Sequence, residues 1–171
     1  GVMGRKLELV YEDEEANPAV ATQKAEKLLQ VGKVDFLTGT VNSGSTLAVG
    51  QVAERKLPGV VVLGGDVHAN FVADLKVDFD DLKAPAVASE FCGTSISSHG
   101  RAQASIDAAL PLNPHLHLGR SNQRGYIAFD IDDKQLLAKL MTVDRPQDAA
   151  SPVRETARFV VDPARPGPQR G

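Results

Sequence analysis

Tryptophan is absent from the 171 residues, and aromatic residues together make up only 5% of them. A core must therefore rely on the aliphatic residues within the 42% hydrophobic share. Cys92 is the single cysteine, so neither an intrachain disulfide nor a multi-cysteine zinc site can form. No apolar run approaches the ~20 residues of a membrane-spanning helix, and no secretory signal is visible at the N-terminus.

A strong excess of charge is also lacking, since 19 basic and 22 acidic residues give a net charge of -3. Nucleic-acid binding needs a surplus of Lys and Arg against phosphates, so we expect no nucleic-acid partner. The charged fraction of 24% is ordinary for a globular protein. A chain of this length can bury roughly 70% of its unfolded surface, which predicts a folded domain with a real core.

Residues 1–55 predict a βαβα segment. Asn17 before Pro18 is typical of a helix start, because Asn caps free N–H groups and Pro suits the first helical turn. The elements expected here are strands at Lys6–Tyr11 and Val34–Leu37 and helices from Pro18 to Gly32 and from Thr46 to Arg55.

Residues 56–161 predict a region dominated by strands, and 162–171, rich in Pro, Gly and Arg, predict a flexible tail. Val60–Leu63 is a continuous apolar run, as in strands buried on both faces. The stretch Leu112–Gly125 is expected to be a loop. The remaining expectations are strands at 86–91, 126–131, 136–143 and 158–161, a hairpin turn at 132–134, a weak helix over 101–110, and a strand or helical turn at 71–75.

Asp66 and His68 are the strongest candidate site residues, because they follow the buried Val60–Leu63 strand directly. Open α/β sheets place ligand sites beyond the carboxyl ends of their strands. A carboxylate and a neutral imidazole two residues apart are suitable ligands for a divalent or trivalent metal. Spacing alone leaves an alternative open, in which Asp66 caps a loop and His68 satisfies a buried acceptor.

Several ordered blocks resemble PhoD-type alkaline phosphatases and phosphodiesterases. Residues 60–68 (VVVLGGDVH) resemble the last metal-binding motif of that family, and residues 88–98 (ASEFCGTSISS) its E-F-x-G-T-S-I block. Asn113–His115, Arg124–Tyr126 and the ending at 153–167 fit its C-terminal region. The resemblance covers about residues 53–171.

This resemblance implies a metallophosphoesterase fold, an α/β architecture of two mixed sheets packed face to face and flanked by helices. It implies hydrolysis of a small phosphate ester through a metal-bound hydroxide, with iron and calcium as cofactors. Asp66 and His68 would be metal ligands, and Asn70 and His115 would assist in substrate binding. The early Asp, Tyr, Cys and Asn ligands of the family have no identified counterpart here, and Cys92 is interpreted as a small buried residue.

About residues 5–55 resemble a different family, the type I periplasmic binding proteins, and among them the branched-chain amino-acid receptors of ABC importers. The resemblance rests on residues 6–13, 34–39 and the loop Asn42–Thr46. In that family a serine at the position of Ser43 binds the ligand's α-carboxylate, next to the free N–H groups of a helix start. The alternative is that a hydroxyl of this loop merely caps the second helix.

The two resemblances meet near residues 53–55, which predicts a fused chain with a binding-protein-like segment over 1–55, a PhoD-like region over 56–161 and a tail over 162–171. Three functions remain open: a metal-dependent phosphoesterase or its incomplete remnant, a solute-binding module for a branched-chain amino acid, or a non-functional fusion chain. Exposed sheet edges in such a fusion predict self-association. Both families are exported, which predicts a periplasmic or secreted location.

Overall fold

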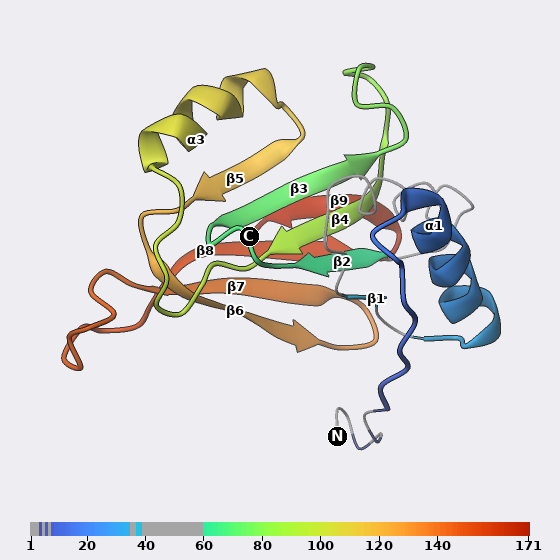
Figure 1. The fold of residues 1–171 in the computed structure, drawn as a ribbon, viewed down its shortest axis with the longest axis horizontal. Coiled ribbons are helices and arrows are strands. Elements are labelled where there is room, and N and C mark those ends of the chain that lie inside the picture. Colours follow the sequence, from blue (N-terminus) through green and yellow to red (C-terminus); the bar gives the residue numbers. More distant parts are fainter. Residues whose placement is uncertain (1–3, 5, 7, 35–36, 39–59) are drawn as a thin grey trace.

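Two β-sheets packed against each other form the body of the protein (Figure 1). The computed structural model describes residues 4, 6, 8–34, 37–38 and 60–171. The strands of the first sheet are β1 (Leu37–Thr38), β2 (Val61–Gly64), β3 (Asn70–Lys76), β4 (Ala86–Cys92) and β5 (Leu116–Arg120). Their order is β1-β2-β4-β3-β5. The sheet is mixed, because β1, β2 and β4 run parallel whereas β3 is antiparallel to both of its neighbours, β4 and β5.

The second sheet is an antiparallel meander in which each strand pairs with the next one along the chain. Its strands are β6 (Arg124–Ile131), β7 (Leu136–Val143), β8 (Arg154–Asp162) and β9 (Arg165–Arg170). The predicted hairpin at 132–134 is confirmed, because the carboxylate of Asp132 accepts hydrogen bonds from the backbone N–H groups of Lys134 and Gln135, both at 2.8 Å. The prediction that both sheets are mixed is wrong for this second sheet.

The main core lies between the sheets and contains residues from both of them. Val61, on β2, faces this core, whereas Val62 faces the opposite side of the first sheet. The expectation of a strand buried on both faces is therefore confirmed at β2. Phe91 and Phe159 are each 1% exposed and lie with their ring centroids 6.4 Å apart across the two sheets.

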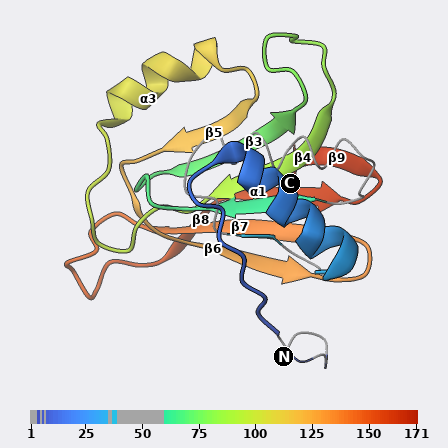
Figure 2. The ribbon, with the colours of Figure 1, turned by 45° about the vertical axis from the view of Figure 1, so that its right-hand side comes forward.

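Helix α1 (Pro18–Glu26) packs against the face of the first sheet that carries Val62, opposite the core between the sheets. It lies in front of the strands in Figure 2. Asn17 caps it as predicted, since its side-chain oxygen accepts a hydrogen bond from Ala19 N–H at 2.9 Å. The helix continues through a π turn (Lys27–Val31) to Gly32, also as predicted. Ala25 packs against Val62 and the rest of a small apolar cluster. Further along the chain, α3 (Gln103–Ala109) and a 3-10 turn (Leu110–Leu112) precede β5.

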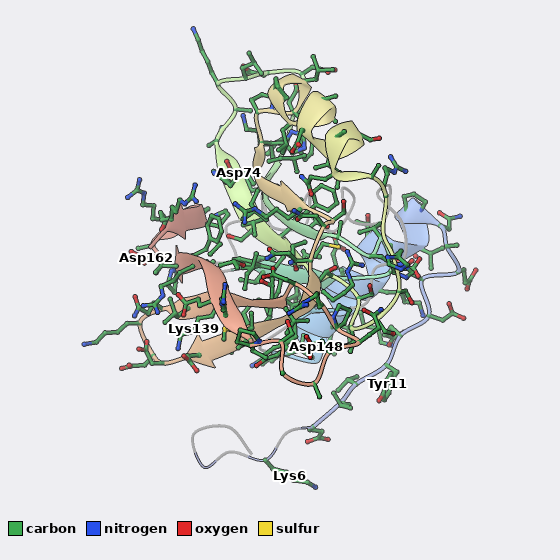
Figure 3. All side chains as sticks on the ribbon, turned by 90° about the vertical axis from the view of Figure 1, so that its left-hand side faces the viewer. Lys6, Tyr11, Asp74, Lys139, Asp148 and Asp162 are labelled. Atoms are coloured by element: carbon green, nitrogen blue, oxygen red, sulfur yellow. The ribbon has the colours of Figure 1, made fainter. Side chains whose placement is uncertain are left out.

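The prediction of a strand at Lys6–Tyr11 is wrong, because the described residues of this segment form no ladder. Tyr11 is 82% exposed and extends from the N-terminal segment (Figure 3). Instead of backbone pairing, an ion pair fixes the segment, with Glu12 accepting from Lys24 at 2.8 Å. Alternating hydrophobicity shows which face a strand would bury, but it supplies no partner for the backbone hydrogen bonds.

Two further predictions are wrong because they assigned no strand where the structure has one. Part of the expected loop Leu112–Gly125 forms β5, which pairs with β3. The expected flexible tail at 162–171 forms β9, which pairs with β8 and buries Gly167 and Pro168. Both strands are short and poor in β-branched residues, so tertiary packing decides their conformation. Residues 71–75, for which a strand or a helical turn was expected, lie within β3.

Candidate functional site

Asp66 and His68 follow β2 directly and line the same pocket of about 500 Å³. The pocket lies where the β2–β3 loop and the segment after β4 meet strand β6. Its polar lining comes from these two residues and from Thr94 and Ser95. The apolar part of the lining consists of Leu63, Phe91, Ile96, Tyr126, Ile127 and Phe129.

The backbone at both candidate ligands adopts a conformation that L-residues rarely take. The φ angles are 68° at Asp66 and 54° at His68, in the left-handed region. A hydrogen bond from Val67 N–H to the carbonyl oxygen of Gly65, at 2.9 Å, tightens the turn between them. Backbone strain of this kind clusters at functional sites, so the turn supports a role for this pair beyond capping a loop.

Within the described part of the chain, Nδ1 of the His68 imidazole has a hydrogen-bond partner and Nε2 has none. Its Nδ1 lies 2.9 Å from the carbonyl oxygen of His99. Since a carbonyl oxygen can only accept, Nδ1 must carry the proton, and the neutral ring then keeps the lone pair of Nε2. Metal-ligating histidines are commonly oriented by such a bond from the second ring nitrogen to a backbone carbonyl.

Arg124, at the start of β6, is 5% exposed and connects the segments that frame the pocket. Its Nη1 donates to the hydroxyl of Ser95 at 2.8 Å and to the carbonyl oxygen of His68 at 3.2 Å. Nη1 also donates to the carbonyl oxygen of Ser98, and Nη2 to that of Ser121. Burial lowers the pKa of Arg124, but the ordinary pKa of a guanidinium is so high that the side chain remains charged.

Asn70, predicted to assist in substrate binding, has a different place in the structure. It is 2% exposed and is not among the residues that line the pocket. Its side-chain oxygen accepts a hydrogen bond from Thr94 N–H at 3.0 Å. The hydroxyl of Thr94 in turn donates to the carbonyl oxygen of Gln123 at 3.2 Å. Asn70 therefore holds the segment that follows β4 in place through a hydrogen bond to its backbone.

His115, the other predicted substrate-binding residue, lies toward the opposite end of β3 from the Asp66 turn. Its carbonyl oxygen accepts from Asp74 N–H at 2.9 Å, and its ring packs edge-on against Phe79 with centroids 4.8 Å apart. The structure therefore does not bring His115 together with Asp66 and His68. Ser43, the predicted ligand-binding serine, and the helix expected at 46–55 lie outside the described residues.

A second polar pair, His117 and Asp74, lies at this far end of the sheet, and Figure 3 marks Asp74. His117 Nε2 is 3.0 Å from Asp74 Oδ1, and this hydrogen bond raises the pKa of His117. The nearby His115 shifts the other way: burial, followed by the charge of Lys76, lowers the pKa of His115. The two histidines therefore contribute pH dependence of opposite sign.

We expect the His117–Asp74 pair to stabilise the fold more at acidic than at alkaline pH. Because the pKa of His117 in the folded chain lies above the ordinary 6.5, its contribution is complete below pH ~6.5 and disappears as the pH rises through the folded-state pKa. The difference in urea midpoint between the wild type and His117→Gln should therefore shrink from pH 5.5 to pH 8.5. An equal difference at both pH values contradicts the prediction, and His115→Gln serves as the control of opposite sign.

Cys92 and Glu90, on β4, lie close to the turn that carries Asp66. Burial, together with the negative charges of Glu90 and Asp66, raises the pKa of Cys92 to about 12, so the thiol stays protonated. The interpretation of Cys92 as a small buried residue is confirmed. Burial also raises the pKa of Glu90. The sequence placed Glu90 in the block at 88–98 that resembles the phosphatase family, but it indicated no chemical role for this carboxyl.

The donor chemistry of the pocket fits a hard or borderline cation, but the number of donors is small. A carboxylate oxygen and an imidazole nitrogen with a fixed tautomer are suitable ligands. Within the described ranges, however, no group of three or more His, Cys, Asp and Glu side chains gathers around a common point. Asp66 and His68 alone therefore offer two donors, and a firmly held catalytic metal needs further ones.

The structure thus consists of two packed sheets, with the carboxylate of Asp66 and the imidazole of His68 in one pocket at the end of a buried strand. The chain belongs to the PhoD-like phosphatase family, whose sequence model matches residues 14–140. It is similar to alkaline phosphatase D of Bacillus subtilis (strain 168), with 32% identity over 112 residues, which make up 64% of this chain. It is also similar to the solved structure of PhoD, with a TM-score of 0.62, 29% identity and 74% of this chain covered.

The chain spans only part of these relatives, namely 19% of the Bacillus protein and 26% of the chain in the solved PhoD structure. The family match starts at residue 14 and so includes most of the segment 5–55 for which a second family was expected. The comparisons do not show a binding-protein fragment. Among the described residues, no helix combines the length and hydropathy needed to cross a membrane.

Proposed function

We propose that this chain supplies part of a metal-dependent phosphoesterase site, either as an active enzyme or as a remnant of one. The observation that carries the proposal is the placement of Asp66 and His68 on one strained turn at the end of β2, lining one pocket. Family membership supports the same reaction class. The proposed substrate is a small phosphate ester. Iron and calcium as the metals, and a periplasmic or secreted location, belong to this proposal as well.

The residues of the chain have separable roles in the proposed site. The carboxylate of Asp66 and Nε2 of His68 would hold a cation. When bound there, a cation offsets the negative charge of a phosphate ester and activates the attacking water. Thr94 and Ser95 line the same pocket. Their hydroxyl groups already donate to the carbonyl oxygens of Gln123 and Ser98, so these two residues shape the pocket wall. The apolar wall that includes Phe129 reduces the water around the charges and so strengthens their interaction.

Cation binding by the full chain tests this proposal directly. We expect calorimetric titration with Ca²⁺, and with Fe³⁺ kept soluble by a weak chelator, to show binding that falls at least tenfold in Asp66→Asn and in His68→Gln. Asp133→Asn is the matched control, because Asp133 is an exposed carboxylate in the distant β6–β7 turn. Cation binding that is equal in the wild type and in Asp66→Asn overturns the proposed metal site.

Hydrolysis is tested separately with an aryl phosphate and an aryl phosphodiester in the presence of both metals. If the chain is active, its rate should fall ~100-fold or more in Asp66→Asn, because a metal-activated nucleophile accounts for several kcal/mol of the barrier. A wild-type rate no higher than that of Asp66→Asn removes the enzymatic part of the proposal. Cation binding without turnover identifies the chain as a remnant.

A further inference from the structure

Arg124 is a buried cation, and the four hydrogen bonds that it forms among the described residues all go to neutral oxygen atoms. Removing a guanidinium from water is unfavourable unless its N–H groups find strong acceptors. Here the acceptors are three backbone carbonyl groups and one hydroxyl. They come from three separate segments: the β2–β3 loop, the β4–α3 segment and the β5–β6 connection. Arg124 therefore holds together the three loops around the pocket, and we call Arg124 with its four acceptors the clamp.

We propose that Arg124 is the positioning residue for His68, which it orients through the backbone of the β4–α3 segment. Nη1 donates to both the His68 carbonyl oxygen and the Ser98 carbonyl oxygen. The residue after Ser98 is His99, whose own carbonyl oxygen accepts from Nδ1 of His68 at 2.9 Å. Arg124 thus closes a ring in which the backbone of His68 and its imidazole are both tied to the same short segment.

The close approach of the two backbones supports this ring. A Cβ added at Gly100 would lie 2.2 Å from the His68 carbonyl oxygen, so the 98–100 segment touches the turn that carries His68. Gly125 N–H donates to the carbonyl oxygen of Ser95 at 3.2 Å, which ties the strand of Arg124 to the same segment. The hydroxyl of Ser95 donates to the Ser98 carbonyl oxygen and so supports the position of this acceptor.

The consequence for the site is a fixed tautomer of His68. With the His99 carbonyl held in place, the proton stays on Nδ1 and Nε2 keeps its lone pair for the pocket. A lysine at position 124 cannot replace this function, because one ammonium group cannot span the oxygen of Ser121 on one side and those of His68 and Ser98 on the other. The planar guanidinium reaches both sides through separate nitrogen atoms.

This inference rests on the proposed function for its biological meaning, but its test needs neither metal nor substrate. The test is the tautomer of His68 in the full chain, measured by long-range ¹H–¹⁵N correlation of the imidazole at a pH where the ring is neutral. Loss of one signal set in His68→Gln assigns the resonances. We expect Nδ1–H alone in the wild type and a mixture of tautomers in Arg124→Lys.

Two controls separate positioning from a general loss of stability. Arg158→Lys exchanges the same residue types at an exposed position, where Arg158 pairs with Glu155 at 2.7 Å. Val161→Ala opens a cavity in the core between the sheets without touching the clamp. Both should keep the wild-type tautomer. Ser95→Ala leaves Arg124 in place but removes one acceptor, and it should shift the tautomer ratio partway.

Three results overturn the proposal: Nε2–H as the main tautomer of wild-type His68, a wild-type ratio in folded Arg124→Lys, or a changed ratio in Val161→Ala. If Arg124→Lys does not fold, Ser95→Ala decides, and a wild-type ratio in that variant counts against the clamp. In Arg124→Lys, cation binding should weaken ~10-fold, as expected for losing the support behind a metal ligand. If Arg124→Lys shifts the tautomer ratio but the wild-type chain binds no cation, the role of Arg124 in positioning His68 is supported and the proposed function is not.

Discussion

Replacing Gly125 with alanine is expected to lower the free energy of unfolding by roughly 3 kcal/mol or more, from backbone strain and overpacking together. The φ angle of Gly125 is 155°, which glycine adopts at no steric cost and alanine does not. A Cβ at this position would lie 2.0 Å from the carbonyl oxygen of Met141 on β7. Since that atom belongs to the backbone of a paired strand, the clash cannot be relieved by a side-chain rotation.

The measurement is urea denaturation followed by far-UV circular dichroism, because the chain has no tryptophan for fluorescence. Gly93→Ala is the matched control: a Cβ at Gly93 has no atom within 4 Å, so the expected change stays within about 0.5 kcal/mol. If Gly125→Ala is as stable as Gly93→Ala, the close approach between β6 and β7 is not present in solution.

Local signals in the sequence account for the parts of the fold that were predicted correctly. The Asn17–Pro18 pair marks the helix start, and the Asp132 turn marks the hairpin, because in both cases the residues that decide the conformation lie within a few positions of each other. The Val60–Leu63 run needed no knowledge of its partners, since continuous apolarity alone indicates burial on both faces.

Long-range pairing accounts for the parts that could not be predicted. The strand character of β9 depends on its pairing with β8, and that of β5 on its pairing with β3, which lies more than forty residues earlier in the chain. The composition of both segments indicated a loop or a tail, because Gly and Pro disfavour a strand when its partner is not known. Lys6–Tyr11 shows the reverse error, a good strand pattern that has no partner among the described residues.

The candidate site shows the same difference between local signals and long-range contacts. Asp66 and His68 could be predicted because both candidate ligands lie in one short motif after one strand. The function of Arg124 could not, since it depends on carbonyl oxygens of residues that are up to 56 positions away. The Arg124–Tyr126 block supported the family resemblance without indicating why it matters. In the structure, Arg124 gathers the loops and Gly125 permits the close contact with β7.

Phe91→Ala is the second substitution with a large expected effect, a loss of about 3–5 kcal/mol of unfolding free energy. Phe91 lies on β4, is 1% exposed, and packs edge-on against Phe129 of β6 with centroids 5.6 Å apart and against Phe159 of β8. One side chain of the first sheet therefore contacts two strands of the second. Truncation leaves a cavity at the contact between the sheets, where rigid strands on both sides prevent collapse.

Phe91→Leu, which keeps most of the buried volume, should lose clearly less stability than Phe91→Ala in the same urea denaturation. Because Phe91 also belongs to the apolar wall of the pocket next to Asp66, Phe91→Ala should weaken cation binding in the folded state as well. This loss should remain in binding measured well below the urea transition. A loss under about 1 kcal/mol in Phe91→Ala would mean that the two sheets do not pack through this ring, since such a small loss is typical of exposed positions rather than of a core.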